Sequence, residues 1–217
     1  MFGSALSFND LLFLLQGAGV TLSITFWAML GGTLLGIAFG LFRASVPWWA
    51  SAPLGFVLDI LRSVPLLIQF VLANSFKSII GLNWSPFTVA CVMLALYTSA
   101  YCAEIVRGGI LSVPATTRRA GRSLGLTYGQ DLTSIVFPLA LRVALPNWIG
   151  LSLGVMKDTA LVLWIGIIEL LRSSQILVTR LQEPLFILMI VGLIYFAMSF
   201  PIARIGARLE KRWREND

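Results

Sequence analysis

The segment VPATTRRAGRSLGL, residues 113–126, is a polar and basic stretch in a chain that is otherwise strongly apolar. Of the 217 residues, 58% are hydrophobic and only 12% are charged, whereas soluble domains are about 45–50% apolar. This composition predicts an integral membrane protein. Because residues 113–126 are too polar to enter the hydrocarbon core, we expect them to lie outside it.

Five apolar stretches flank this segment, and each is long enough to cross a bilayer core, which needs about 20 helical residues. They cover residues 17–42, 53–75, 86–106, 143–168 and 184–204. A shorter stretch, FNDLLFLL at residues 8–15, predicts a separate interfacial helix. No basic region precedes it, so we expect no cleaved signal peptide. The expected fold class is an all-α integral membrane protein with five transmembrane helices and a short N-terminal interfacial helix.

The positions of Lys and Arg predict the orientation, because cytoplasmic loops are enriched in both residues. We expect the N-terminus outside and the C-terminus in the cytoplasm, which leaves only Lys77, Arg172 and Arg180 outside. The cytoplasmic side then receives Arg43, Arg107, Arg118, Arg119, Arg122, Arg142, Arg204, Arg208, Lys211, Arg212 and Arg214.

Residues 107–142 form the one long loop expected on the inside. The loop is polar, but its pattern predicts short helices, since Pro114 can begin a helix and Gly125 can end it. A structured loop of this size is usually functional. We therefore expect it to contact another molecule.

Lys157 and Asp158 lie side by side within the apolar run GVMKDTALVL, residues 154–163. Adjacent residues on a helix point about 100° apart, so each needs a partner elsewhere. Asp59, Arg62 and Glu104 are candidates, as are the backbone groups of a broken helix. A fixed salt bridge between helices and a polar lining of a central passage are both consistent with the pattern.

Other polar groups in the spans allow two interpretations each. Asp59 and Arg62 are neighbours on a helix that Pro65 should break, and they predict either a structural ion pair or part of a gate. A hydroxyl and carboxylate stripe predicts either a solute-facing surface or ordinary packing, and it consists of Tyr97, Thr98, Tyr101 and Glu104.

Three glycines in the first span favour close packing of helices, within the subunit rather than between subunits. They are Gly32, Gly36 and Gly40.

Several classes of function are disfavoured. The chain has 16 Lys and Arg against 10 Asp and Glu, but it lacks the aromatic-interleaved basic stripe of a nucleic-acid-binding protein. It has no histidine, no phosphate-binding loop and no nucleophile motif, so catalysis by this chain is not expected and no metal site is predicted. Cys91 and Cys102 would lie about 16 Å apart on a helix, too far for a disulfide.

The long loop also carries a resemblance. Arg119-Ala120-Gly121, Gly125 and the stretch from Ile135 to Pro138 match the spacing of the EAA loop of bacterial ATP-binding-cassette importer permeases. The resemblance extends over nearly the whole chain and is closest to the polar amino-acid branch of that family. The matching segments, in order, are LRSVPLLIQF, AYCAEIVRGGILSVP, LGLTYGQ, FPLALRVALPNWIG, MKDTALV, IGIIELLRSSQ and ARLEKRW.

This resemblance implies a type I importer permease fold, acting as a homodimer or heterodimer in the bacterial inner membrane. It implies no cofactor on this chain, ATP and magnesium on cytoplasmic ATPase subunits, an extracytoplasmic solute-binding protein, membrane lipid around the spans and no nucleic acid. The coupling loop would contact the ATPase through Pro114, Arg118, Arg119, Ala120, Gly121, Arg122 and Gly125. The resemblance also places Lys157 and Asp158 near the substrate pathway, with Asp158 favoured over Lys157. Together with the polar groups singled out above, the predicted pathway or gate comprises Arg62, Tyr97, Thr98, Tyr101, Glu104, Lys157 and Asp158.

One position departs from the family pattern. The glutamate of the EAA loop is Arg119 here, and the Gly-Gln before it is Thr116-Thr117. Either the ATPase surface has changed sign, or this subunit is the divergent member of a heterodimer, which we favour.

The sequence therefore predicts the permease subunit of an ATP-driven amino-acid importer, not an enzyme, and the alternative is a channel or secondary transporter that needs no ATPase. The predicted organisation is an N-terminal segment at 1–16, a permease domain at 17–209 and a cytoplasmic tail at 210–217.

Overall fold

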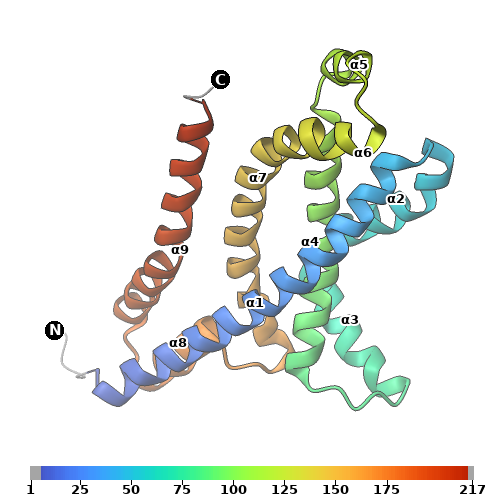
Figure 1. Cartoon of the computed structure of the whole chain (residues 1–217). Helices are drawn as coiled ribbons and strands as arrows, with labels where there is room; N and C mark the ends of the chain where they lie inside the picture. Colours follow the sequence, from blue (N-terminus) through green and yellow to red (C-terminus); the bar gives the residue numbers. More distant parts are fainter. Residues whose placement is uncertain (1–5, 215–217) are drawn as a thin grey trace.

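The computed structural model describes residues 6–214, and every element in this range is helical (Figure 1). The elements, in chain order, are α1 (Phe8–Ser45), α2 (Trp48–Ser63), α3 (Leu66–Ile79), α4 (Pro86–Leu111), α5 (Ala115–Ser123), α6 (Tyr128–Asp131), η1 (Leu132–Val136), α7 (Phe137–Asp158), η2 (Thr159–Ile165), α8 (Leu170–Leu181) and α9 (Pro184–Arg214). Of these, η1 is a π-helix and η2 is a 3₁₀ helix.

The first helix differs from its prediction. Residues 8–15 are not a separate interfacial helix but the first turns of α1, which runs without a break from Phe8. Ser7 and Asp10 form a capping box that fixes this start, and the Ser7 N–H donates to Asp10 Oδ2 at 3.0 Å. Leu14 is fully buried against α8 and α9, so this end is held by packing. Residues 1–5 of the predicted N-terminal segment lie outside the described residues, as do residues 215–217 of the predicted tail.

The second predicted span is broken at Pro65, as expected. The axes of α2 and α3 meet at 104°. The side-chain amide of Gln69 donates to the carbonyl oxygens of Leu61 and Val64, each at 2.8 Å, and so caps the end of α2. Among residues 6–214, four helical stretches are long and apolar enough to cross a membrane, and there are five if the bent pair forms one span. The predicted count is therefore confirmed only in this coarser form.

The fourth predicted span also ends differently. The α-helical part stops at Asp158, and the chain continues as the tighter η2 until Gly166, whose φ of 88° is in the left-handed region. A helix that changes type in the middle of an apolar run leaves backbone groups without their usual partners. The expected break in this span is therefore present, and it starts directly after the two charges.

The glycines of α1 allow α4 to pack closely on it. A Cβ atom at Gly32 would lie 2.5 Å from the Thr98 Cβ, and one at Gly36 would lie 2.4 Å from the Cys102 Cβ. At Gly40 the nearest atom would be the Ala103 carbonyl oxygen at 2.7 Å. No side chain fits at these contacts, so the prediction that these glycines pack within the subunit is confirmed.

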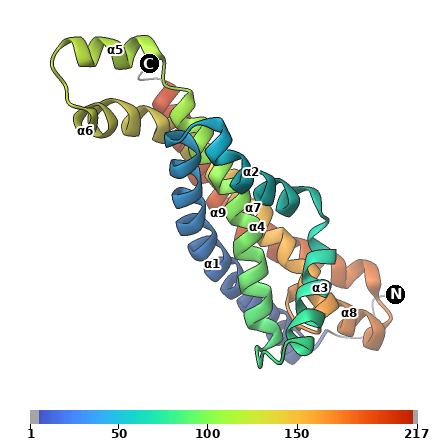
Figure 2. The same cartoon turned by 90° about the vertical axis from the view of Figure 1, so that its right-hand side faces the viewer.

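Helix α8 was not predicted, because Arg172 and Arg180 made residues 169–183 look like an outer loop. It lies beside the N-terminal end of α1 (Figure 1). The opposite end of the molecule carries α5, α6 and the C-terminal end of α9, as both views show (Figures 1 and 2). The first turns of α1 and the last turns of α9 therefore lie at opposite ends of the bundle.

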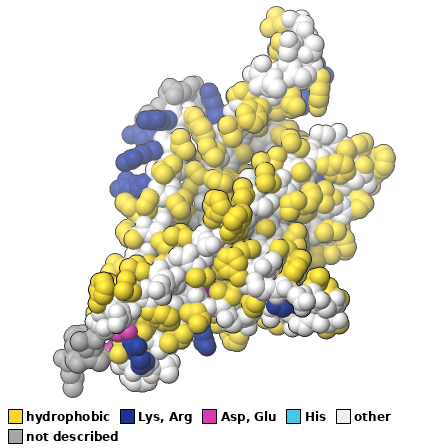
Figure 3. All heavy atoms as spheres, turned by 60° about the horizontal axis from the view of Figure 1, so that its bottom comes forward, with side chains coloured by type: hydrophobic (Ala, Val, Ile, Leu, Met, Phe, Trp, Pro, Cys, Tyr) yellow, Lys and Arg dark blue, Asp and Glu magenta, His cyan; other side chains and the backbone are white. Residues whose placement is uncertain are grey.

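Hydrophobic side chains cover most of the visible surface, and Lys and Arg gather near the C-terminal end of α9 (Figure 3). Many large apolar side chains are exposed, among them Phe26 and Trp27 on α1 and Leu193 and Phe196 on α9. A soluble protein would bury such a surface, whereas lipid tails cover it in a membrane.

Candidate functional site

The first candidate region is the coupling segment, which we define as residues 114–136, covering α5, α6 and η1. Pro114 precedes α5, and its fixed φ suits the start of a helix. At the other end Leu126 N–H donates to Gly121 O at 3.2 Å and Gly125 N–H donates to Arg122 O at 3.0 Å, a Schellman motif. This motif places Gly125 at a φ of 88°. The predicted helix start and stop are therefore confirmed.

An internal ion pair holds the coupling segment together. Asp131 is fully buried, and its Oδ2 accepts a hydrogen bond from Arg118 Nε at 3.0 Å and forms an ion pair with Arg118 Nη2, also at 3.0 Å. Gly121 is also buried, because a Cβ there would lie 2.5 Å from Ile135 Cδ1. Arg118 and Gly121 thus stabilise the fold of this segment. Gly121 is buried, whereas the Arg118 side chain is still partly exposed.

The remaining predicted coupling residues are on the surface. These exposed residues are Pro114, Arg119, Ala120, Arg122 and Gly125. Two large side chains beside them are also exposed, Leu124 at 86% and Tyr128 at 64%. In Figures 1 and 2, α5 projects beyond the ends of the other helices.

Four charges from three helices form an ion-pair cluster that includes two predicted pathway residues. Glu104 on α4 accepts a hydrogen bond from Arg43 on α1 and lies 3.9 Å from Arg62 on α2. Arg62 also pairs with Asp59, one turn earlier. Gly55 gives the Arg43 guanidinium room, since a Cβ there would lie 3.1 Å from it. The cluster joins α1, α2 and α4, and none of its members pairs with Lys157 or Asp158.

The second candidate region lies where α7 breaks. The Tyr97 hydroxyl donates to that of Tyr101 at 3.3 Å, with ring centroids 4.8 Å apart. Asp158 is half-buried and lies within electrostatic range of Tyr97. Lys157 is exposed. Within residues 6–214, neither Lys157 nor Asp158 forms an ion pair. The structure therefore places Asp158 within electrostatic range of Tyr97, which bonds Tyr101, and Lys157 is the preceding residue of the chain.

Two residues of the predicted stripe lie elsewhere. Thr98 is fully buried against α1, where its Cβ faces Gly32, because it lies about 100° around the helix from Tyr97. Glu104 belongs to the ion-pair cluster described above. The hydroxyl stripe on α4 is therefore reduced to its two tyrosines.

A third polar centre, around Glu169, was not predicted. Glu169 is fully buried and caps α8, accepting N–H bonds from Leu171 at 2.8 Å and Arg172 at 2.7 Å. The hydroxyls of Thr21 on α1 and Tyr195 on α9 approach its Oε2 at 3.5 and 3.4 Å. Burial raises the pKa of Glu169 above its ordinary value, although these hydrogen bonds act in the opposite direction.

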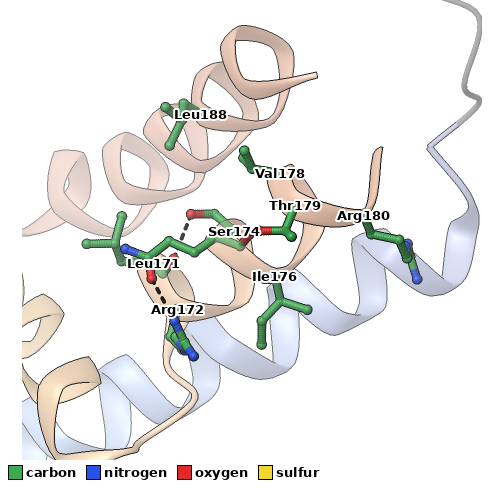
Figure 4. A pocket seen from close by; sticks show the side chains of 9 residues that line it. Leu171, Arg172, Ser174, Ile176, Val178, Thr179, Arg180 and Leu188 are labelled. Atoms are coloured by element: carbon green, nitrogen blue, oxygen red, sulfur yellow. Dashed lines mark hydrogen bonds between the residues drawn. The ribbon is translucent and has the colours of Figure 1, made fainter. Parts of the chain in front are cut away.

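Near this centre, one face of α8 lines an open groove of 760 Å³ (Figure 4). Arg172 and Arg180 lie toward its two ends, and Leu188 of α9 faces it across the groove. Arg180 also pairs with Asp10 and so ties α8 to the start of α1.

The residues that sequence reasoning missed are Arg43, Asp131 and Glu169. Arg43 was counted only as a topology signal, because it ends an apolar span. Glu169 had a readable signal, since it follows Gly166 and precedes LLRSSQ, where a side chain can cap a new helix. Asp131 had no signal beyond the polar loop around it.

Comparison with known proteins decides the family. Residues 32–215 match the family described as binding-protein-dependent transport system inner membrane component. The chain belongs to this family. It is a permease subunit and not itself an ATPase, and it carries no cofactor of its own. Among described residues, no three His, Cys, Asp or Glu side chains gather into a metal site.

Individual relatives are similar over almost their whole length. The chain is 32% identical to the glutamine transport system permease protein of Escherichia coli (strain K12), over 93% of each chain. It is 32% identical to a probable amino-acid ABC transporter permease protein of Bacillus subtilis (strain 168), over 98% of this chain and 94% of that one.

Solved structures agree with the fold. The crystal structure of an amino acid ABC transporter with histidines superposes with a TM-score of 0.84 at 29% identity, covering 92% of this chain and 94% of that one. The MetNI methionine ABC transporter superposes at 0.74 with 21% identity, covering 94% and 99%, which supports the fold alone.

Proposed function

We propose that this permease subunit imports an amino acid, and that the solute passes the break in α7 between Asp158 and the Tyr97–Tyr101 pair. The relatives named for glutamine and for amino acids support this solute class. The observation that carries the proposal is the charge at the break: within residues 6–214 Lys157 and Asp158 form no ion pair, and Asp158 acts electrostatically on Tyr97, whose hydroxyl bonds that of Tyr101.

The chemistry of an amino acid fits these groups. A zwitterion that enters a low-dielectric passage must exchange its water for fixed polar partners of both signs. Asp158 supplies a carboxylate for an ammonium group, and Lys157 supplies a cation for a carboxylate. Neither is drawn into the ion-pair cluster, in which Glu104 pairs with Arg43 and Arg62.

In this proposal a second permease chain, identical or related, completes the path. The N-terminus and α8 face outward, where a solute-binding protein delivers the solute. The coupling segment then lies in the cytoplasm, where exposed side chains of α5 contact the ATPase. Arg118 and Gly121 serve the same contact indirectly, by keeping α5 in place.

Replacing the carboxylate at the break tests the proposal. In cells that depend on this system, Asp158→Asn should reduce the uptake of labelled glutamine and other polar amino acids at least about tenfold, because a charge-assisted contact is lost. Glu183→Gln is the matched control, since this carboxylate lies in the turn between α8 and α9. It should transport normally. Normal uptake by Asp158→Asn at wild-type protein levels would exclude the proposed path.

A further inference from the structure

The exposed side of α5 carries an uncompensated positive charge. The helix has three arginines and no acidic residue. Arg118 forms an ion pair with the buried Asp131 of the same segment. Arg119 and Arg122 are exposed, three residues apart and thus neighbours on the helix, and neither has an ion-pair partner in residues 6–214.

The surface around these two arginines suits a protein better than a lipid headgroup. Leu124 and Tyr128 beside them are exposed at 86% and 64%. Arginine and tyrosine next to an apolar side chain are typical of protein interfaces. Helix α5 also projects beyond the ends of the other helices rather than lying among their apolar surfaces (Figures 1 and 2).

We infer that α5 binds an acidic groove of its cytoplasmic ATPase subunit, with a carboxylate of that subunit facing Arg119 and Arg122. This inference rests on the proposed function, which supplies the ATPase as the partner. Two guanidinium groups that lose water in an interface require anionic partners there. Their planar forks bind carboxylates with two hydrogen bonds. The inference applies to whichever ATPase copy contacts this chain, in a homodimer or a heterodimer.

The ion pair between Arg118 and Asp131 determines which side of α5 is available to the ATPase. Because Asp131 fixes Arg118 and Ile135 packs on Gly121, the orientation of α5 about its own axis is determined. Arg119 and Arg122 must therefore face the partner together. Substitution of either should weaken the same contact, and the acidic groove needs to match only this one side of α5.

Charge reversal in the whole complex tests the inference. We would purify the complex through a tag on this chain, in phosphatidylcholine nanodiscs and in phosphatidylglycerol nanodiscs, and measure the ATPase retained as salt increases. Arg119→Glu and Arg122→Glu should each reduce retention at least about tenfold in both lipids. The wild-type complex should dissociate as salt rises. Arg208→Glu, an exposed reversal near the C-terminal end of α9, is the matched control and should retain the ATPase.

The outcomes separate the two proposals. If the wild-type chain retains no ATPase, the proposed function fails. If the ATPase is retained but Arg119→Glu and Arg122→Glu bind it like the wild type, the acidic groove is excluded and the proposed function stands. A loss confined to phosphatidylglycerol would assign the arginines to lipid and would also overturn the inference. Restoration of Arg119→Glu by reversing an acidic ATPase residue would identify the partner carboxylate.

Discussion

At the scale of single residues, Glu169 links three helices through one side chain. Its carboxylate accepts two backbone N–H groups at the start of α8 and is approached by hydroxyls of α1 and α9. Gly17 allows α1 to approach the start of α8 closely, because a Cβ there would lie 2.5 Å from Ser173 Oγ and 3.0 Å from the Glu169 carbonyl oxygen. Glu169 is fully buried, and burial is costly for a charged carboxylate.

The raised pKa of Glu169 predicts a pH dependence of stability. The folded protein holds the proton more tightly than the unfolded chain, so the free energy of unfolding should fall as the pH rises from the ordinary value of 4.5 through the raised pKa. Above the raised pKa, the contribution of Glu169 to the free energy of unfolding should stay constant. Glu169→Gln has no such titration and should lose this slope, measured as melting temperature against pH in detergent. Glu183→Gln should keep it, and an unchanged slope in Glu169→Gln would contradict the assignment.

How far sequence reasoning reached differs from residue to residue. The glycines of α1, the break at Pro65 and the limits of α5 follow from local chemistry, and all were predicted. The partners of Glu104 were not, because they depend on how α1 and α2 are rotated against α4. Thr98 shows the same limit, since one step along α4 separates a buried packing position from the tyrosine surface.

At the scale of elements, the contact between α1 and α4 depends on the absence of side chains at three glycines. Gly36→Ala should lower the free energy of unfolding by about 1–3 kcal/mol, because the new methyl group would overlap Cys102. Gly19→Ala is the control on the same helix, where nothing lies within 4 Å. It should leave stability unchanged or raise it by up to about 1 kcal/mol. Thermal unfolding in detergent measures both, and equal effects would refute the packing argument.

Elements with long apolar runs were predictable, and those that depend on tertiary contacts were not. The spans at α4 and α9 follow directly from composition. Helix α8 is amphipathic and short, and it is held by the Glu169 cap and by the pairing of Arg180 with Asp10. The same contacts explain why residues 8–15 continue α1 instead of forming a separate interfacial helix, since α8 and α9 pack against them.

At the scale of the whole molecule, the opposite positions of α5 and α8 predict that each is accessible from a different side of the membrane. Cysteine placed at Ser123 on α5 should react with an impermeant maleimide only from the cytoplasmic side, in inverted vesicles. Cysteine placed at Thr179 on α8 should react only from the outside, in spheroplasts. Cys91 and Cys102 lie within α4 and would be replaced first. The reverse labelling pattern would show that the predicted orientation is wrong.

The central claim is that this permease moves its solute only when an ATPase drives it. The most direct measurement is uptake of labelled glutamine and other polar amino acids into proteoliposomes that contain this chain and its solute-binding protein, with and without the ATPase. We predict uptake only with the ATPase and magnesium-ATP, and loss of uptake with Asp158→Asn. Uptake that proceeds without any ATPase would contradict the account and identify a channel or secondary transporter instead.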